Sequence, residues 1–76
     1  MASNVPKEYK EQVEMVGEKI RERRLAKGWS AAQLGDKSGY TEGYILYVER
    51  GDRIPSLKAL IDIADAFNIK LQTLLR

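Results

Sequence analysis

The 76-residue sequence contains no cysteine and no histidine. Without cysteine, neither a disulfide nor a thiolate-bound zinc ion can support the fold. Without histidine, the commonest general base and the commonest metal ligand are both missing. The serine, tyrosine, lysine and aspartate residues show no spacing that is typical of an activated nucleophile. We therefore expect no enzymatic activity, no metal site and no cofactor.

Long apolar runs are also missing. No stretch approaches the roughly 20 apolar residues that a membrane-spanning helix needs. The segment Met1–Lys10 is polar and lacks the apolar centre of a signal peptide. A chain of this length holds one domain at most, which we expect to span residues 1–76. The sequence therefore predicts a single cytoplasmic domain that makes no membrane contact.

Charges of the two signs are nearly balanced, with 13 basic and 11 acidic residues. The basic residues concentrate between positions 19 and 27, where only Glu22 opposes them. This group consists of Lys19, Arg21, Arg23, Arg24 and Lys27. A solvated helix face and a surface that attracts a polyanion are both compatible with such a run.

Apolar periodicity predicts a first helix from about Pro6 to Ala26, with residues 1–15 as an N-terminal extension. Asn4 can cap this helix, and Pro6 suits its first turn because the missing N–H is not needed there. The apolar stripe with a period of 3.6 consists of Tyr9, Val13, Val16 and Ile20, and it continues near Leu25. Gly28 ends the helix in the left-handed conformation.

Four shorter helices are expected to follow. Ser30 and Gln33 form a Ser-x-x-Gln capping box before a helix over Ala31–Lys37, and Thr41 caps a helix over Glu42–Arg50. Ser56 can cap a helix over 57–67, and Asn68 is a left-handed stop for it. The apolar stripe of this helix consists of Leu60, Ile61, Ala64 and Phe67. A last helix holds Leu71, Leu74 and Leu75. No useful β-alternation is present, so the predicted fold class is all-α.

The segment 30–50 has the pattern of a helix-turn-helix. Gly35 is small, so the next helix can cross close above it, and Gly39 supplies positive φ in the turn. Ile45 and Val48, three residues apart, anchor the following helix to the core. Two helices that cross through a tight turn require this spacing.

The stretch from Val16 to Leu75 resembles the Cro/cI repressor-type helix-turn-helix family, also called the xenobiotic-response-element family. The matching segments read VGEKIRERRLAKGWSAAQL, SGYTEGYILYVERGDRIPS and LIDIADAFNIKLQTLL. The resemblance implies a compact, lambda-repressor-like domain of five helices whose third helix enters the major groove of DNA. Within the family, Tyr44 and Ile45 resemble small restriction-modification controller proteins and the Bacillus-type biofilm repressor.

The resemblance also implies roles for individual residues. Arg24 and Glu49 match an arginine and a glutamate that pair across the fold. We favour this structural ion pair over direct DNA contact, because a buried unpaired charge is costly. The chain departs from the family at Ala31, where glutamine usually helps to hold a phosphate, and at Gly35, where alanine is usual. A further departure is Glu42, which takes a position that is usually polar or basic.

The groove-facing residues of the third helix are then Glu42, Gly43, Tyr44 and Tyr47, with Leu46 nearby. Glu42 can accept from cytosine N4 but repels phosphate, and the two tyrosines can donate to phosphates or pack on thymine methyl groups. For Tyr44 a partly buried position, and for Tyr47 a plain surface position, remain alternatives. The expected phosphate contacts are Lys27, Arg50 and Arg53, together with the helix N-termini at Ser30 and Thr41. For each of these side chains alone, plain solvation is an equal alternative.

The apolar C-terminus predicts a homodimer. Ile69, Leu71, Leu74 and Leu75 are four large aliphatic residues among the last eight. One domain of this size cannot easily bury all four, so we expect part of this patch to meet a second copy, which would then read a pseudo-palindromic operator. A monomer whose C-terminal helix is wholly internal is the alternative.

Two functions are compatible with these features. The first is a sequence-specific double-stranded DNA-binding transcriptional regulator of the controller, phage-repressor or antitoxin type. The second is a protein–protein interaction module that reuses the fold, suggested by Tyr44, Leu46 and Tyr47, since exposed aromatic residues suit protein interfaces. Because a DNA binder loses affinity steeply with salt, duplex titrations at two salt concentrations distinguish them.

Overall fold

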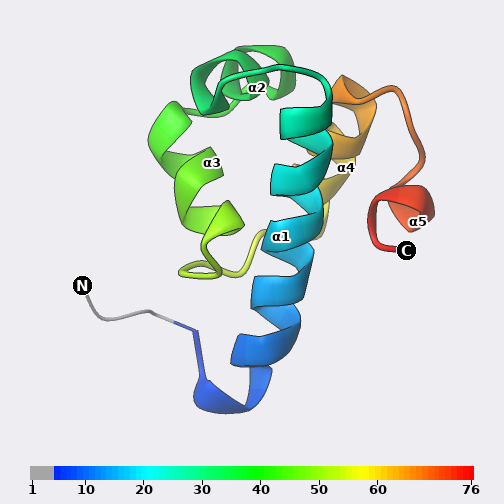
Figure 1. Cartoon of the computed structure of the whole chain (residues 1–76). Helices are drawn as coiled ribbons and strands as arrows, with labels where there is room; N and C mark the ends of the chain where they lie inside the picture. The colour runs from blue at the N-terminus through cyan, green and yellow to red at the C-terminus, as the bar shows by residue number, and fades with distance from the viewer. Residues whose placement is uncertain (1–4) are drawn as a thin grey trace.

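A computed structural model describes residues 5–76 of the chain, so the expected cap Asn4 lies outside the described residues. Within this part, a short 3-10 turn and five α-helices follow one another, and no strand is formed (Figure 1). The elements are the 3-10 turn Lys7–Tyr9, α1 (Lys10–Ala26), α2 (Ala31–Ser38), α3 (Glu42–Glu49), α4 (Leu57–Ala66) and α5 (Leu71–Leu74). The predicted all-α class with five helices is confirmed.

The beginning of the first helix differs from the sequence-based expectation. Pro6 is extended, with ψ at 143°, and its carbonyl oxygen accepts a hydrogen bond from the Tyr9 N–H at 3.0 Å. This bond between residues three apart closes a 3-10 turn, and the α-helical pattern begins only at Lys10. The predicted end at Ala26 is confirmed, whereas the α-helix begins four residues after the predicted start at about Pro6.

The apolar stripe of α1 is narrower than the sequence suggested. Ile20 is fully buried and Val13 nearly so, but Tyr9 and Leu25 are 51% and 53% exposed. Tyr9 precedes the α-helix, so its direction does not follow the period of 3.6. Leu25 lies five residues after Ile20 and therefore about 140° around the helix from it. Arg24 takes the inward position instead.

The core lies where α1, α2, α3 and α4 meet, and α5 closes it from the side of α4. Its buried members are Ile20, Ala31, Leu34, Ile45, Val48, Ile63, Ala64, Phe67 and Leu74. On α4 the inward position belongs to Ile63, whereas Ile61 is 42% exposed because two residues correspond to a rotation of about 200°. Ile61 was therefore wrongly assigned to the apolar stripe, while Ala64 and Phe67 are in the core.

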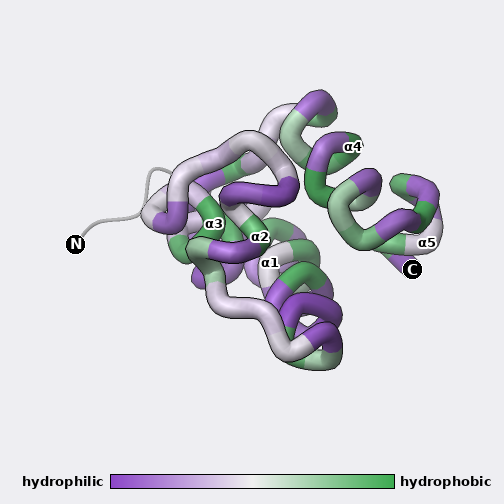
Figure 2. Tube along the Cα trace, turned by 90° about the horizontal axis from the view of Figure 1, so that it is seen from above, coloured by the Kyte–Doolittle hydropathy of each residue, from purple (hydrophilic) through white to green (hydrophobic). Residues whose placement is uncertain are grey.

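The two sides of α1 serve different parts of the fold. Seen from the front and from above, α3 lies to one side of α1, and α4 with α5 lies to the other (Figures 1 and 2). The contact between α1 and α3 is made at Gly17, where a Cβ atom would overlap the backbone carbonyl oxygens of Val48 and Glu49, the second at 2.7 Å. Backbone therefore lies directly against backbone at this crossing.

Candidate nucleic-acid interface

The turn between α2 and α3 is tight because of two glycines. Gly39 takes a φ of 87°, which is strained for residues with a side chain. Gly35 faces the backbone after the turn, and a Cβ atom at this position would lie 2.5 Å from the Tyr40 carbonyl oxygen. The N–H groups of Gly39 and Tyr40 both donate to the Gly35 carbonyl, at 2.8 and 2.9 Å. The close crossing at Gly35 and the positive φ at Gly39 that the sequence indicated are both present.

Hydroxyl groups cap both helices of the motif. The Gln33 N–H donates to Ser30 Oγ at 3.0 Å, and the Ser30 N–H donates to Gln33 Oε1 at 2.7 Å, which confirms the capping box. The Tyr44 N–H donates to Thr41 Oγ1 at 3.1 Å. Each capping oxygen acts here as an acceptor, so each hydroxyl keeps its own proton for a further partner. The capped N-termini can therefore receive an anion.

An ion pair fixes the buried side of α3. Arg24 Nε and a second guanidinium nitrogen donate to the two carboxylate oxygens of Glu49 at 2.6 and 2.9 Å. A third nitrogen of Arg24 donates to the Trp29 carbonyl oxygen at 2.8 Å. Both side chains are buried, and the hydrogen bond with Glu49 raises the pKa of Arg24. Arg24 therefore ties the end of α3 to α1 and to the turn that precedes α2.

The opposite side of α3 is open to solvent. Glu42, Gly43, Tyr47 and Arg50 are exposed, whereas Leu46 is half-buried against the core. The Arg50 guanidinium lies 5.3 Å from the centre of the Tyr47 ring, within the range of cation–π attraction. Arg50 also approaches Asp52, with 3.5 Å between Nε and the carboxylate. This exposed face therefore joins an aromatic ring to a cation.

Tyr44 lies between the core and the surface. Its half-buried ring stacks on that of Tyr40, with 4.9 Å between the ring centres. The guanidinium of Arg53, from the loop after α3, lies 5.9 Å from the centre of the Tyr44 ring. Tyr44 thus takes the partly buried position that the sequence left open as an alternative.

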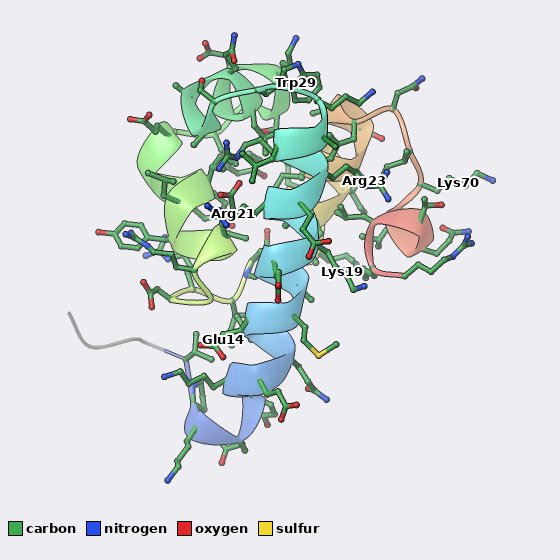
Figure 3. All side chains as sticks on the ribbon, viewed as in Figure 1. Glu14, Lys19, Arg21, Arg23, Trp29 and Lys70 are labelled. Carbon is green, nitrogen blue, oxygen red and sulfur yellow. The ribbon has the colours of Figure 1, made fainter. Side chains whose placement is uncertain are left out.

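A second cationic group lies at the α1–α2 turn. The Nζ atoms of Lys27 and Lys37 are 5.9 and 4.8 Å from the centre of the Trp29 ring, which stacks on Phe67. Trp29 is seen at the end of the molecule where α1 meets α2 (Figure 3). Lys37 was missed by the sequence analysis, because only the fold brings it to Trp29. Ala31 is buried and offers no polar side chain at the start of α2.

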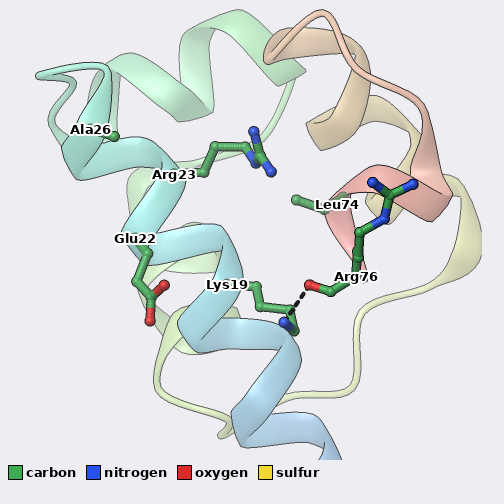
Figure 4. A pocket seen from close by; sticks show the side chains of 6 residues that line it. All are labelled: Lys19, Glu22, Arg23, Ala26, Leu74 and Arg76. Atoms are coloured by element: carbon green, nitrogen blue, oxygen red, sulfur yellow. Dashed lines mark hydrogen bonds between the residues drawn. The ribbon is translucent and has the colours of Figure 1, made fainter.

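A separate hollow lies between α1 and α5, on the side of α1 away from α3 (Figures 1 and 4). It is lined by Lys19, Glu22, Arg23, Ala26, Leu74 and Arg76. Lys19 and Arg23 extend from α1 towards α5, and Lys19 Nζ donates to the Arg76 carbonyl oxygen. By contrast, Lys70 points away from the molecule (Figure 3). The basic run of α1 is therefore divided, and Lys19 bonds to the residue at the end of the chain after α5.

The C-terminal residues differ from the predicted dimer patch in one respect. Leu74 is only 1% exposed and belongs to the core of its own chain, so its side chain has no surface to offer a second copy. Its place in the predicted interface was wrong. Ile69 and Leu71 are half-buried, and Leu75 is 39% exposed.

The described part of the chain offers neither a metal site nor a membrane-spanning helix. Residues 5–76 contain no group of three or more acidic side chains that could hold a metal ion. Over the same described range, no helix is long and apolar enough to cross a membrane.

The geometry of two capped helices crossing at a glycine turn agrees with the sequence comparisons. The profile of the family described as Helix-turn-helix matches residues 20–74. The chain belongs to this helix-turn-helix family. It is of the Cro/cI type, as are the regulators it resembles. The HTH-type transcriptional regulator YgzD of Bacillus subtilis is 35% identical over 54 residues, which cover 71% of this chain and 82% of YgzD.

Two solved structures resemble this helix-turn-helix chain closely. The restriction-modification controller protein C.AhdI from Aeromonas hydrophila has a TM-score of 0.82 and 36% identity over 84% of this chain and 97% of that one. A structure of SinR, a master regulator for biofilm formation, in complex with DNA has a TM-score of 0.74 and 29% identity over 80% of this chain and 98% of that one. SinR of Bacillus subtilis is 31% identical over 62 residues, which cover 80% of this chain and 56% of SinR.

Proposed function

We propose that this DNA-binding transcriptional regulator acts as a repressor by inserting the exposed side of α3 into the major groove of its operator. The observation that carries this proposal is the two-sided α3, whose inner side is fixed by Ile45, Val48 and Glu49 while Tyr47 and Arg50 face outwards. A recognition helix must be held rigidly and still offer side chains to the bases. The SinR structure with DNA supports the same use of the fold.

The residues proposed to contact DNA divide into two classes. We assign base contacts to Glu42, Gly43, Tyr44 and Tyr47. The positions assigned to backbone phosphates are Lys27, Ser30, Thr41, Arg50 and Arg53. Phosphate contacts fix the register of the protein, whereas base contacts carry the sequence preference. The free hydroxyl protons of the two capping residues and the positive ends of their helices support this division.

We expect Tyr47→Ala to weaken binding to the selected operator by about 1–3 kcal/mol with little effect on folding, because the ring is a base contact on an exposed surface. Operators are selected from a random duplex library, and affinity is measured by fluorescence titration. Lys27→Ala and Arg53→Ala serve as matched controls, since loss of a phosphate contact weakens all sequences alike and reduces the salt slope. Unchanged operator affinity in Tyr47→Ala would remove Tyr47 from the groove.

We propose that the chain binds its operator as a homodimer. Leu75 is exposed beside α5, and α4 adds Leu57 and Ile61, which are 63% and 42% exposed and one turn apart. We propose that these residues, with the half-buried Ile69 and Leu71, contribute to the dimer interface in place of Leu74. A two-fold dimer would read a pseudo-palindrome whose half-site centres are about 34 Å apart.

Sedimentation equilibrium at micromolar concentration tests the dimer. We expect a dimeric protein that becomes monomeric with Ile61→Asp or Leu75→Asp, because a buried unpaired carboxylate opposes association. Leu25→Asp is the matched control, since Leu25 is 53% exposed on α1 and outside this surface. A monomeric parent protein that binds one half-site as tightly as the full palindrome would contradict the proposal.

A protein–protein interaction module is the second candidate function. It is supported by the exposed ring of Tyr47 and by the solved complex of SinR with SinI, which is a protein partner. Affinity for duplex DNA that is weak and insensitive to salt would favour this function over DNA binding.

Enzymatic activity is not proposed for this chain. For a regulator that works on DNA we propose a cytoplasmic location. We also propose that residues 1–76 form one helix-turn-helix domain.

A further inference from the structure

A series of side-chain contacts links α4 to the loop that follows α3. The Tyr40 hydroxyl donates to Asp62 Oδ2 at 2.7 Å, and Lys58 Nζ donates to the same oxygen at 2.8 Å. The Tyr40 ring stacks on Tyr44 with an angle of 21° between the ring planes, and the Arg53 guanidinium lies against the Tyr44 ring. We call Tyr40, Tyr44 and Asp62 the tyrosine post. It runs from α4, through the turn before α3, to the first turn of α3.

The protonation states of the tyrosine post suit a strong hydrogen bond. The bonds from Lys58 and Tyr40 lower the pKa of the Asp62 carboxyl. The bond to Asp62 raises the pKa of the Tyr40 hydroxyl. At neutral pH the aspartate is therefore ionised and the phenol protonated, so the bond is charge-assisted and directional. It gives the Tyr40 ring one preferred orientation against Tyr44.

We propose that Tyr40 and Asp62 are positioning residues for DNA binding, because the tyrosine post holds Arg53 ready for a backbone phosphate. This inference rests on the proposed function, in which Arg53 contacts a phosphate. A free arginine side chain has many rotamers, and fixing one of them on binding costs conformational entropy. A ring that already attracts the guanidinium reduces this cost. Tyr40 and Asp62 act through Tyr44 and Arg53 without contacting DNA themselves.

Two substitutions at one position test the proposal. Asp62→Asn and Asp62→Ala remove the same negative charge, but only asparagine keeps an oxygen that can accept from the Tyr40 hydroxyl. With a random-sequence duplex at low salt, we expect Asp62→Ala to bind about threefold more weakly than Asp62→Asn, the size of a lost cation–π contact. In an Arg53→Ala background this difference should vanish on the random-sequence duplex, because the post then has no phosphate contact to position. Tyr40→Phe keeps the ring and the charge of Asp62 but loses the hydroxyl, so it should bind about threefold more weakly than the unmodified protein.

Thermal unfolding of each variant verifies that it is folded at the titration temperature. Equal binding by Asp62→Ala and Asp62→Asn, or a threefold difference that persists with Arg53→Ala, overturns the proposal. Absence of salt-dependent duplex binding by the unmodified protein contradicts the proposed function instead. In that event, ¹⁵N relaxation of the Arg53 side chain in the free protein tests whether the tyrosine post restrains it. A more mobile Arg53 in Asp62→Ala than in Asp62→Asn supports the post, and equal mobility overturns it.

Discussion

Arg24→Ala should lower the free energy of unfolding by about 3–5 kcal/mol, because it leaves the carboxylate of Glu49 buried without a partner. Glu49 is only 6% exposed, and its two oxygens receive both of their side-chain hydrogen bonds from Arg24. Glu49→Ala should cost a similar amount, since it leaves a guanidinium that is 8% exposed with only the Trp29 carbonyl. Denaturant unfolding followed by circular dichroism measures both.

The double variant separates pairing from packing. If the two side chains stabilise each other, Arg24→Ala combined with Glu49→Ala should cost less than the two single losses added together. A combination of Arg24→Met and Glu49→Leu, which replaces the pair by apolar side chains, should recover part of the stability, since a buried ion pair gains little over well-packed apolar residues. Strict additivity in this cycle would show that the two charges act independently.

Gly17→Ala should destabilise the protein by about 3 kcal/mol, at the upper end of the usual cost of overpacking. The added methyl group would meet the backbone carbonyl oxygens of Val48 and Glu49, and neither can turn aside as a flexible side chain would. This overlap can be relieved only if α1 and α3 move apart. Such a movement also lengthens the ion pair between Arg24 and Glu49. We therefore expect a lower unfolding midpoint and weaker DNA binding together.

Gly43→Ala is the matched control for the stability measurement alone, since Gly43 is itself assigned a base contact. Gly43 is exposed on α3, and a Cβ atom there meets nothing within 4 Å. The same substitution should therefore stabilise the protein by about 0.5 kcal/mol through higher helix propensity. Equal effects of the two substitutions would mean that the close crossing of α1 and α3 does not constrain the fold.

Features that depend on neighbouring residues could be read from the sequence. The capping box at Ser30 and Gln33 and the positive φ of Gly39 are local, and both were predicted. Leu25 was expected near one apolar stripe and Ile61 within another, yet both are exposed. A period of 3.6 leaves two adjacent positions near the edge of a stripe, and only packing selects one of them.

Features that join distant segments could not be found in this way. Nothing near Gly17 indicates that the end of α3, some thirty residues on, would cross it without room for a methyl group. The bond between Tyr40 and Asp62 likewise spans 22 residues. Lys58 and Asp62 are four residues apart on α4, and this spacing alone indicates their ion pair. It does not indicate that Tyr40 bonds to the same aspartate. Leu74 appeared available to a partner because the sequence cannot show how deeply α5 docks.

The division of α3 into a fixed side and a free side has a consequence for how such a protein can change. Residues that hold the helix, such as Ile45 and Glu49, are buried, whereas Glu42, Gly43 and Tyr47 are at the surface and are not part of the core. Randomising these three positions should therefore yield a library in which nearly every member folds, since surface substitutions usually alter stability by less than about 0.5 kcal/mol. One scaffold can thereby diverge towards new operators by single substitutions, with no compensating change in its interior.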